Sequence, residues 1–526
     1  MSYLVSGTVL DIDAPSYSGA TKTKASVTLR LITRVLISAV ALLVLDGCMF
    51  DHYTTTGTGE GDPTWQGTQS ETASAVAFAG GRTIFITTYN DDTEDGKITY
   101  TTNDRVVFPG ASMLGWSYSL DKGKTWKYGG KVKPPRGIAV LWGDPAIVVS
   151  PRNYSRVYIT SLAIADGKIS PTGHHGRLDD GSITGACVAR SDDGGIHFAI
   201  QSCFSESGHF YDGSSLAAGF GSDTRIFAAF RDTDNSHIDI WASPDGLAPF
   251  VKIADPFPGM QMISHPRLAY DQNTGALLVA AISDGNQLIY MNRLVGTTWQ
   301  TPVIASFATS GIDIPVGTQT IRMAYGFSFD VGTPSETALK LGGVKMAIGV
   351  DAIRLLYTTR DAETKRIYVR GSACWADLRK CNDVPQWGTT PGNLNTPRNQ
   401  WNPTVKAWIG FIGLAPEWKA TYQTTDDDPN AVSIKQGNLA VLPDGTPIFL
   451  PSNLVAPRPI CPDFRYGSAG SAVGGYWGDY DEMAFAGLGD SKTPEFLLAF
   501  SDSSKGCVSQ SEFTSKHLHV SSVVIK

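Results

Sequence analysis

A short pair of apolar strands recurs along most of this chain, and no other feature of the sequence limits the fold as strongly. In each copy a polar residue, often next to Pro or Gly, opens an apolar strand, and a turn and a second apolar strand follow. Clear copies open at Asp144, Asp212, His265, Asn402 and Asp479, and weaker ones near Ser74 and Arg322. Since such small units cannot bury their apolar faces alone, we expect seven of them to pack against one another.

Composition favours strands over helices. The chain has 526 residues, more than one compact core usually holds, and is rich in Gly (55), Pro (29) and aromatic residues (10 %). The formal net charge is −7 and there is no long basic run, which argues against nucleic acid as a partner. We therefore expect an all-β protein with a repeat architecture.

A sharper motif lies in the second half of several copies. Residues 119–126 (SLDKGKTW) fit the pattern S-x-D-x-G-x-T-W throughout, and residues 191–198 (SDDGGIHF) fit it with His for Thr and Phe for Trp. In such a turn the Asp accepts backbone N–H groups, the Gly supplies a positive φ, and the aromatic ring packs beneath the hairpin. We therefore assign a structural role to Ser119, Asp121, Gly123, Trp126, Ser191, Asp193, Gly195 and Phe198.

These motifs resemble the Asp-box (BNR) repeats of bacterial sialidases and of their non-catalytic relatives. The resemblance covers most of the chain after residue 62 and implies a β-propeller of four-stranded blades. Sialidases proper have six blades, whereas the repeats of this chain favour seven, with six as the alternative. We expect the last strand, from His517, and a segment near Trp65 to share one blade and close the ring.

The N-terminal residues 1–48 read as a lipoprotein-type signal segment. Basic residues precede an apolar run at 35–45 that is too short to span a bilayer, and Leu45-Asp46-Gly47-Cys48 resembles a bacterial lipobox. Asp46 departs from that pattern, so an ordinary signal peptide and an uncleaved anchor stay as alternatives. We expect Cys48 to carry lipid, residues 49–61 to form a flexible tether, and residues 62–526 to form the propeller, exported to the cell envelope at the outer membrane or cell surface.

The cysteine count agrees with export. Of seven cysteines, lipidation of Cys48 leaves six, an even number. Cys187 and Cys203 flank the middle of a predicted hairpin, and Cys374 and Cys381 are close in sequence. We therefore predict the disulfides Cys187–Cys203, Cys374–Cys381 and Cys461–Cys507, with six reduced, buried thiols as the alternative.

In a propeller the residues that open the innermost strands meet around the central axis. The predicted ring consists of Asp144, Asp212, His265, Arg322, Asn402 and Asp479. Such a ring either lines a solvated channel or binds a ligand, and its carboxylates could hold Ca²⁺, although no spacing specifies a metal. No other cofactor is expected.

The resemblance to sialidases implies an arginine cluster, an acid and a Tyr nucleophile beside a Glu. The candidates are Arg136, Arg231 and Arg465 for the arginines, Asp144 or Asp232 for the acid, and Tyr480 with Glu482 for the nucleophile. The match is incomplete, because Arg136 lacks the aromatic residue and the Pro that flank the family's first arginine.

Three functions remain open at this point. The first is an envelope-anchored, monomeric propeller that binds a glycan, a polysaccharide or an envelope protein. The second is an exo-glycosidase of the exo-α-sialidase type. The third is a polysaccharide lyase that uses His174 or His175 with a Tyr to abstract a proton.

Overall fold

We describe the protein from a computed structural model. The structure describes residues 55–57, 69–91, 98–100, 105–107, 110–165, 185–206, 209–260, 263–272, 274–283, 287–308, 312–316, 319–323, 326–331, 340–341, 344–345, 353–360, 363, 365–374, 377–378, 381–384, 399–408, 417–425, 432–441, 447–449, 453–455, 481–488, 494–502 and 519–525. Within these ranges all regular structure is β, and no helix there is long and apolar enough to cross a membrane.

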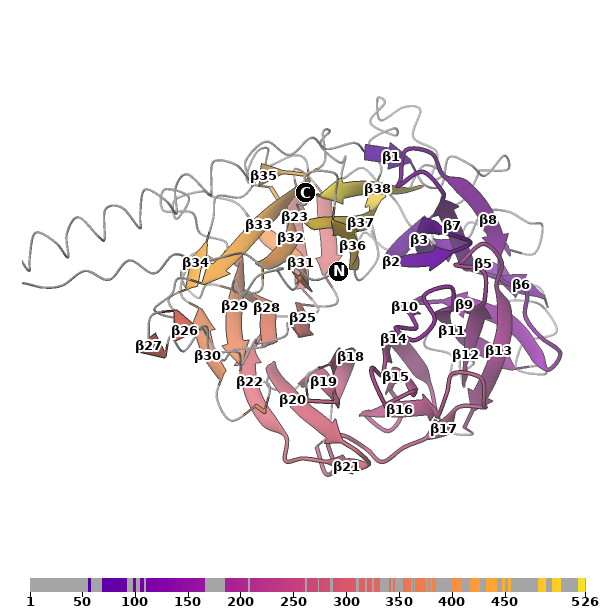
Figure 1. Ribbon diagram of the computed structural model, residues 1–526, viewed down its shortest axis with the longest axis horizontal. Helices are drawn as coiled ribbons and strands as arrows, with labels where there is room; N and C mark the ends of the chain where they lie inside the picture. Colours follow the sequence, from indigo (N-terminus) through magenta and orange to yellow (C-terminus); the bar gives the residue numbers. More distant parts are fainter. Residues whose placement is uncertain are drawn as a thin grey trace, which may run out of the picture. The chain divides into compact units, whose positions relative to one another are not determined.

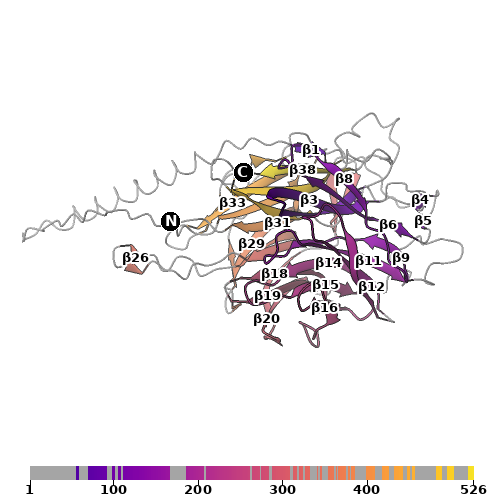
Figure 2. The ribbon, with the colours of Figure 1, turned by 45° about the vertical axis from the view of Figure 1, so that its right-hand side comes forward.

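Seven antiparallel sheets follow one another in a ring, which confirms the predicted β-propeller of seven four-stranded blades (Figure 1). Figure 2 shows the same sheets turned, with strands of successive blades following one another around the ring. We number the blades 1 to 7 in chain order, from the sheet that contains β2 to the sheet that contains β36. The innermost strands of consecutive blades contact one another, so order along the chain is also order around the ring.

The strands of the first four blades are as follows. Blade 1 has β2 (Gln69–Ala79), β3 (Arg82–Asp91), β7 (Leu114–Ser119) and β8 (Lys127–Lys131). Blade 2 has β9 (Ile138–Gly143), β10 (Ile147–Val149), β11 (Val157–Ala165), β12 (Gly185–Ser191) and β13 (Ala199–Ser205), with β6 (Ala111–Ser112) parallel to β9. Blade 3 has β14 (Tyr211–Ala218), β15 (Ile226–Asp232), β16 (His237–Ser243) and β17 (Val251–Lys252). Blade 4 has β18 (Ile263–Asp271), β19 (Ala276–Ser283), β20 (Leu288–Val295), β21 (Thr298–Trp299) and β22 (Val303–Phe307).

The remaining blades are built in the same way. Blade 5 has β25 (Phe327–Val331), β28 (Ile353–Arg360), β29 (Ile367–Cys374) and β30 (Cys381–Val384). Blade 6 has β31 (Gln400–Trp408), β32 (Glu417–Thr424), β33 (Ser433–Val441), β34 (Pro447–Phe449) and β35 (Asn453–Leu454). Blade 7 has β36 (Met483–Leu488), β37 (Pro494–Asp502), β38 (His519–Ile525) and β1 (Thr55–Gly57). Three hairpins lie outside the blades: β4 (Ile98–Tyr100) with β5 (Arg105–Val107), β23 (Ile312–Val316) with β24 (Gln319–Met323), and β26 (Lys340–Leu341) with β27 (Val344–Lys345).

Blade 7 joins the two ends of the propeller chain. Its outermost strand is β1, which pairs antiparallel with β38 from Thr55↔Val523 to Gly57↔Ser521. The ring therefore closes in the way that the sequence predicted, and β1 covers the outer edge of β38 at Ser521–Val523. The closing strand lies earlier than expected, in the segment assigned to the tether rather than near Trp65.

The hydrophobic core consists of layers between blades. Every pair of neighbouring blades shares a cluster of buried side chains, as in the layer where Ile84 and Ile86 of blade 1 meet Val157 and Ile159 of blade 2. Middle strands are covered on both faces, so β19 (ALLVAAIS) is buried at every position. This explains the unbroken apolar runs in the sequence. Full burial of one large aliphatic side chain is worth about 1.5–3 kcal/mol.

The turns with the S-x-D-x-G pattern connect the outer strands and pack against the preceding blade. In blade 2, Ser191 Oγ donates to Asp193 Oδ1 (2.7 Å), and the Gly195 N–H donates to Ser191 Oγ (2.8 Å). Gly195 has φ +88°, and a Cβ there would lie 2.6 Å from Ile86 Cδ1 of blade 1. The turn at residues 119–126 repeats these bonds, and its Trp126 packs with Phe85 and Leu497, between blades 1 and 7.

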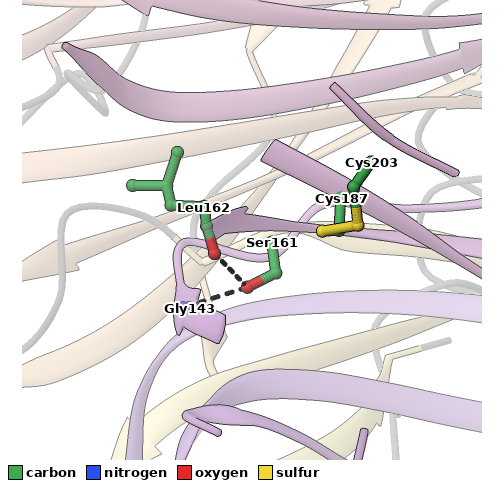
Figure 3. The surroundings of a disulfide bond; sticks show 5 residues. All are labelled: Gly143, Ser161, Leu162, Cys187 and Cys203. Carbon is green, nitrogen blue, oxygen red and sulfur yellow. Dashed lines mark hydrogen bonds between the residues drawn. A yellow bond between two sulfur atoms is a disulfide. The ribbon is translucent and has the colours of Figure 1, made fainter. Parts of the chain in front are cut away.

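Two of the predicted disulfides are present. Cys187 and Cys203 are directly paired across β12 and β13, with Cα atoms 4.1 Å apart (Figure 3). Cys374 and Cys381 likewise join β29 to β30. The third predicted pair, Cys461–Cys507, and the predicted lipidation site Cys48 lie outside the described residues.

Candidate functional site

The innermost strands are bent at one equivalent position in several blades, and this bend builds the candidate site. Residues at the bend have a positive φ: Glu71 (53°), Asp144 (51°), Gly213 (55°), His265 (55°) and Asn402 (48°). The pairing register shifts at the same points in β2, β14, β18 and β31, and in blade 2 the bend separates β9 from β10. Because a bulge turns polar groups out of the ladder, the bends direct backbone and side-chain polar atoms toward the axis.

Hydrogen bonds connect the bends of blades 1, 2 and 3. The Asn90 amide of β3 donates to Glu71 Oε2 (2.5 Å), and its Oδ1 accepts the Asp144 N–H (2.7 Å). Asp144 Oδ2 in turn accepts the Gly213 N–H (3.1 Å), and Ser214 Oγ donates to the Asp144 carbonyl (2.5 Å). Each bend therefore fixes the next, and the network positions Asp144 between two neighbouring blades.

Asp212, which also belongs to this network, is a carboxyl group with a raised pKa. It precedes the bend at Gly213, and Arg231 Nη1 of β15 lies 3.5 Å from its Oδ2. Burial and the adjacent Asp144 carboxylate raise the pKa of Asp212 to about 6, although Arg231 opposes the shift. Its side chain is 34 % exposed, so a ligand could reach it. A carboxyl group with such a pKa can be protonated near neutral pH, which is the state a proton donor needs.

A second acid–arginine pair crosses the ring. Arg267 of β18, in blade 4, places Nη1 3.6 Å from Glu482 Oε1 at the start of blade 7 and 3.5 Å from the Ser214 carbonyl. Blades 4 and 7 are not neighbours, so this contact joins opposite sides of the axis. Burial raises the pKa of Glu482, against the effect of Arg267 and Lys406.

Asp481 connects the first, sixth and seventh blades. Its Oδ1 accepts the Thr72 hydroxyl (2.9 Å), and its Oδ2 accepts the Gln423 amide (2.9 Å) and lies 3.4 Å from Asn402 Nδ2. These two oxygens and Asp144 Oδ2 already serve as hydrogen-bond acceptors. A calcium ion at the ring therefore stays a prediction with no added support.

The structure places the predicted ring residues as follows. Asp144, His265 and Asn402 lie at bends, and Asp212 lies next to one. Arg322 instead lies on β24, paired with Asp313 in the separate hairpin, and the inner strand of its blade starts later, at Phe327. Asp479 lies outside the described residues.

The predicted sialidase residues are only partly placed. Arg231 and Glu482 lie at the ring, but in two different acid–arginine pairs. Arg136 is exposed in the turn before β9. Asp232 is fully buried and contacts His209 rather than the ring. The candidates Arg465, Tyr480, His174 and His175 lie outside the described residues.

Four ring residues escaped the sequence analysis: Glu71, Asn90, Arg267 and Asp481. Two of them carried a usable signal. Glu71 precedes a strand in the same way as the other strand-opening residues, and Arg267 directly follows His265-Pro266. Asn90 belongs to the second strand of its blade, and no repeat pattern points to it.

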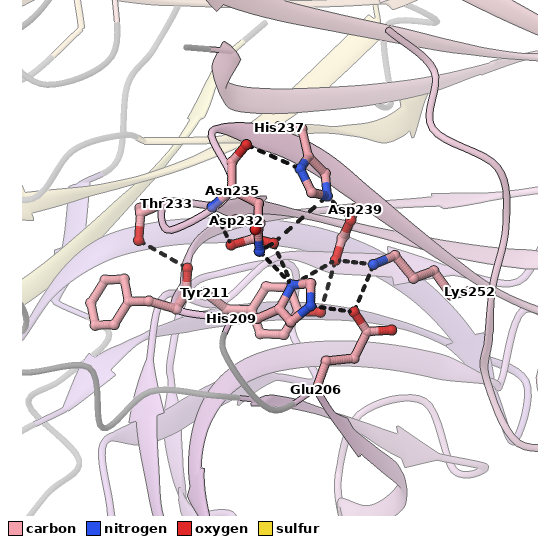
Figure 4. A network of polar contacts seen from close by, with 10 residues as sticks. Glu206, His209, Tyr211, Asp232, Thr233, Asn235, His237, Asp239 and Lys252 are labelled. Atoms are coloured by element: carbon pink, nitrogen blue, oxygen red, sulfur yellow. Dashed lines mark hydrogen bonds and ion pairs between the residues drawn. The ribbon is translucent and has the colours of Figure 1, made fainter. Parts of the chain in front are cut away.

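A separate polar cluster lies in blade 3, where β15 ends and β16 begins (Figure 4). It contains Glu206, His209, Tyr211, Asp232, Asn235, His237, Asp239 and Lys252. In the described part of the chain, only this cluster brings three or more His, Cys, Asp or Glu side chains within the reach of one metal ion.

Comparisons with known proteins concern the fold. No protein-family model matches the sequence, and no curated protein is detectably similar to it. Among solved structures, the Hadza microbial sialidase Hz136 is similar over 90 % of this chain and 68 % of that chain, at 12 % identity and a TM-score of 0.41. The α-L-arabinanase of Penicillium chrysogenum is similar over 90 % of this chain and 97 % of that chain, at 10 % identity and a TM-score of 0.41. The GH93 α-L-arabinofuranosidase of Fusarium graminearum is similar over 76 % and 97 %, at 12 % identity and a TM-score of 0.41.

Proposed function

We propose that the protein is a glycan-binding β-propeller whose binding site is the ring of bent inner strands. One observation carries this proposal: the bends bring carboxylates, an amide and arginines from several blades to one end of the inner strands. A few convergent polar groups on a rigid frame are what fixes the orientation of a hydroxyl-rich ligand. The turns at residues 119–126 and 191–198 support assignment of the blades to Asp-box repeats, but they hold the hairpins and contribute nothing to binding.

The test is glycan binding by the full-length protein, measured by calorimetry over neutral and acidic oligosaccharides. We expect Arg231→Gln to weaken binding at least tenfold. Arg190→Gln is the matched control, because the Arg190 side chain is also 26 % exposed and also pairs with an Asp, outside the ring. Equal affinities of the two variants, or no binding across the panel, would contradict the proposal.

A second candidate is glycoside hydrolysis, of the exo-α-sialidase type or a related one. The pKa of Asp212 favours it, because a general acid for the leaving oxygen must be protonated at the working pH. In this proposed reaction Asp212 donates the proton to the leaving oxygen, and the neighbouring Asp144 carboxylate keeps the pKa of Asp212 raised. Arg465, Tyr480 and Glu482 keep their sialidase roles only as part of this proposal.

Fluorogenic sialosides and other aryl glycosides test the second candidate. If Asp212 is the acid, turnover falls as the pH rises through about 6, and Asp212→Asn lowers kcat by about 10²-fold or more. Tyr480→Phe should abolish sialoside turnover in particular. Glycan binding without turnover of any substrate would contradict this second candidate and support the first.

We further propose that the protein is exported and anchored through a lipidated Cys48. The two disulfides support an oxidising compartment, because cytosolic thiols are usually kept reduced. Mass spectrometry of the mature N-terminus tests the lipid, and Cys48→Ala should release the protein from the membrane fraction. Size-exclusion chromatography of that released protein tests the predicted monomer, and co-purification tests an envelope protein as partner.

A further inference from the structure

The polar cluster of blade 3 combines deep burial with excess negative charge. The side chains of Asp232 and Asp239 are 0 % and 2 % exposed, and Glu206 lies beside them. Lys252 is the permanent cation that contacts these carboxylates, 2.7 Å from Glu206 and 2.8 Å from Asp239. Within the described residues, three carboxylates against one ammonium leave two negative charges without a permanent positive partner. Since a buried charge is costly unless it is paired, the cluster needs two further positive charges.

The outer contacts of the two histidines show which ring nitrogens face inward. His209 Nε2 lies 3.0 Å from Glu206 Oε2, and His237 Nδ1 lies 3.3 Å from the Asn235 carbonyl. Both partners are acceptors, so in the neutral tautomer that satisfies them these nitrogens carry the proton. The other nitrogens, His209 Nδ1 and His237 Nε2, then present lone pairs to the interior of the cluster.

These inward lone pairs face carboxylate oxygens. His237 Nε2 lies 2.8 Å from Asp239 Oδ1 and 3.6 Å from Asp232 Oδ2. His209 Nδ1 contacts the same Asp232 oxygen and lies 3.9 Å from Asp239 Oδ2 (Figure 4). An acceptor that faces an acceptor at these distances is repulsive, so a proton or a metal ion must lie between them. Two protons or one divalent cation would also supply the two missing charges.

We propose that a divalent transition metal of the zinc class binds here, held by Asp232, His237 and Asp239, with His209 as a fourth donor. Imidazole nitrogen with carboxylate oxygen is a donor set that suits Zn²⁺ and its neighbours in the first transition row, whereas Ca²⁺ takes oxygen ligands. Donors at about 2.0–2.2 Å from a tetrahedral ion lie about 3.3–3.6 Å apart. His237 Nε2 and Asp232 Oδ2 already have this separation, at 3.6 Å, whereas His237 Nε2 and Asp239 Oδ1, at 2.8 Å, would move apart as the ion enters.

The surroundings of the donors match those of metal sites. A ligating histidine usually donates its other N–H to a carboxylate or a backbone carbonyl, which is the arrangement at His209 and His237. Asn235 Nδ2 donates to Asp232 Oδ2 (2.8 Å), and the Tyr211 hydroxyl donates to Asp239 Oδ2 (2.9 Å). Asp239 Oδ1 is therefore the oxygen directed at the metal.

The experiment is metal titration of the full-length protein after removal of metals with a chelator. We expect one equivalent of Zn²⁺ or Co²⁺ to bind, excess Ca²⁺ not to compete, and bound Co²⁺ to show the visible absorption of a site with nitrogen and oxygen donors. His237→Gln should weaken binding at least 100-fold. Glu206→Gln should weaken it about tenfold, since outer contacts typically contribute 10- to 100-fold.

Two controls keep the test decisive. His197→Gln changes an exposed histidine that also pairs with an aspartate, in a turn outside the cluster, and should leave affinity unchanged. If His237→Gln does not fold, the metal affinity of Glu206→Gln and the titration of the unmodified protein still test the proposal. The proposal is overturned if the unmodified protein binds no equivalent of Zn²⁺ or Co²⁺. Binding that His237→Gln does not weaken overturns it as well.

Discussion

At the outer turns of blades 1 and 2, Asp121 and Asp193 accept hydrogen bonds from groups of their own turns, whereas at the bent inner strands Asp144 and Asp212 face groups of other strands and blades. Although burial opposes it, hydrogen bonds from Thr125 lower the pKa of Asp121, and bonds from His197 do the same for Asp193. Burial and Asp144 instead raise the pKa of Asp212. Aspartate therefore stabilises the fold at the turns, whereas at the ring its carboxyl group can still take up or release a proton near neutral pH.

The largest expected effect concerns the hairpin that carries the second turn. Replacing both Cys187 and Cys203 by Ala removes a cross-link that closes a loop of 16 residues, which should cost about 3 kcal/mol of unfolding free energy. Denaturant unfolding of the double variant measures this cost. A loss of glycan binding at unchanged stability would contradict a purely structural role for this end of the blade.

Gly195→Ala should have the next largest effect, about 2 kcal/mol of destabilisation. The alanine would have to keep the positive φ of Gly195, and its Cβ would press on Ile86 of blade 1, 2.6 Å away. Gly296→Ala is the control, because it has φ +63° with nothing within 4 Å of its Cβ position and so isolates the backbone cost. Equal melting temperatures for the two variants would show that the turn does not press on the neighbouring blade.

Asp193→Asn should cost about 1 kcal/mol at neutral pH, through the loss of charge-assisted hydrogen bonds in the turn. Because the folded-state pKa of Asp193 is lowered, its contribution is present above the pKa of the unfolded chain and is lost as the pH falls through the folded value. The difference between wild type and variant should therefore shrink below about pH 4, as thermal unfolding across pH would show.

The smallest effect on stability, with the opposite dependence on pH, is expected for Asp212→Asn. The raised pKa of Asp212 stabilises the folded state fully only below the pKa of the unfolded chain, and this contribution is lost as the pH rises through about 6. The variant should therefore gain stability relative to wild type between pH 5 and pH 8. A loss of stability relative to wild type over this range would show that Asp212 stabilises the fold in its charged form, as the turn aspartates do.

The blades were predictable because their signals are local. Apolar runs such as 276–281 (ALLVAA) record burial between two blades, and the turn motif and the cysteine spacing act within single hairpins. The inner strand of blade 5 was harder to predict, since the separate hairpin that contains Arg322 directly precedes it in the sequence. At this blade the repeat pattern alone could not show which strand faces the axis.

The site was less predictable, because its contacts are long-range. The bend positions were visible as strand-opening residues, but the partner of Arg267 lies in another blade, more than two hundred residues along the chain. The blade 3 cluster gave no motif either. His209, Asp232 and His237 come from a loop, a strand end and a strand start, and only the pairing of β14, β15 and β16 brings them together.

The pairing of β1 with β38 has a practical consequence for anyone who shortens this protein. A recombinant chain that starts at residue 62, where the sequence motifs begin, would lack Thr55–Gly57 and leave part of β38 as an open strand edge. Exposed edges of this kind recruit strands from other molecules and promote aggregation. Thr55–Gly57 thus cover part of an edge that would otherwise be open to other copies of the protein, and we expect soluble production to depend on keeping them.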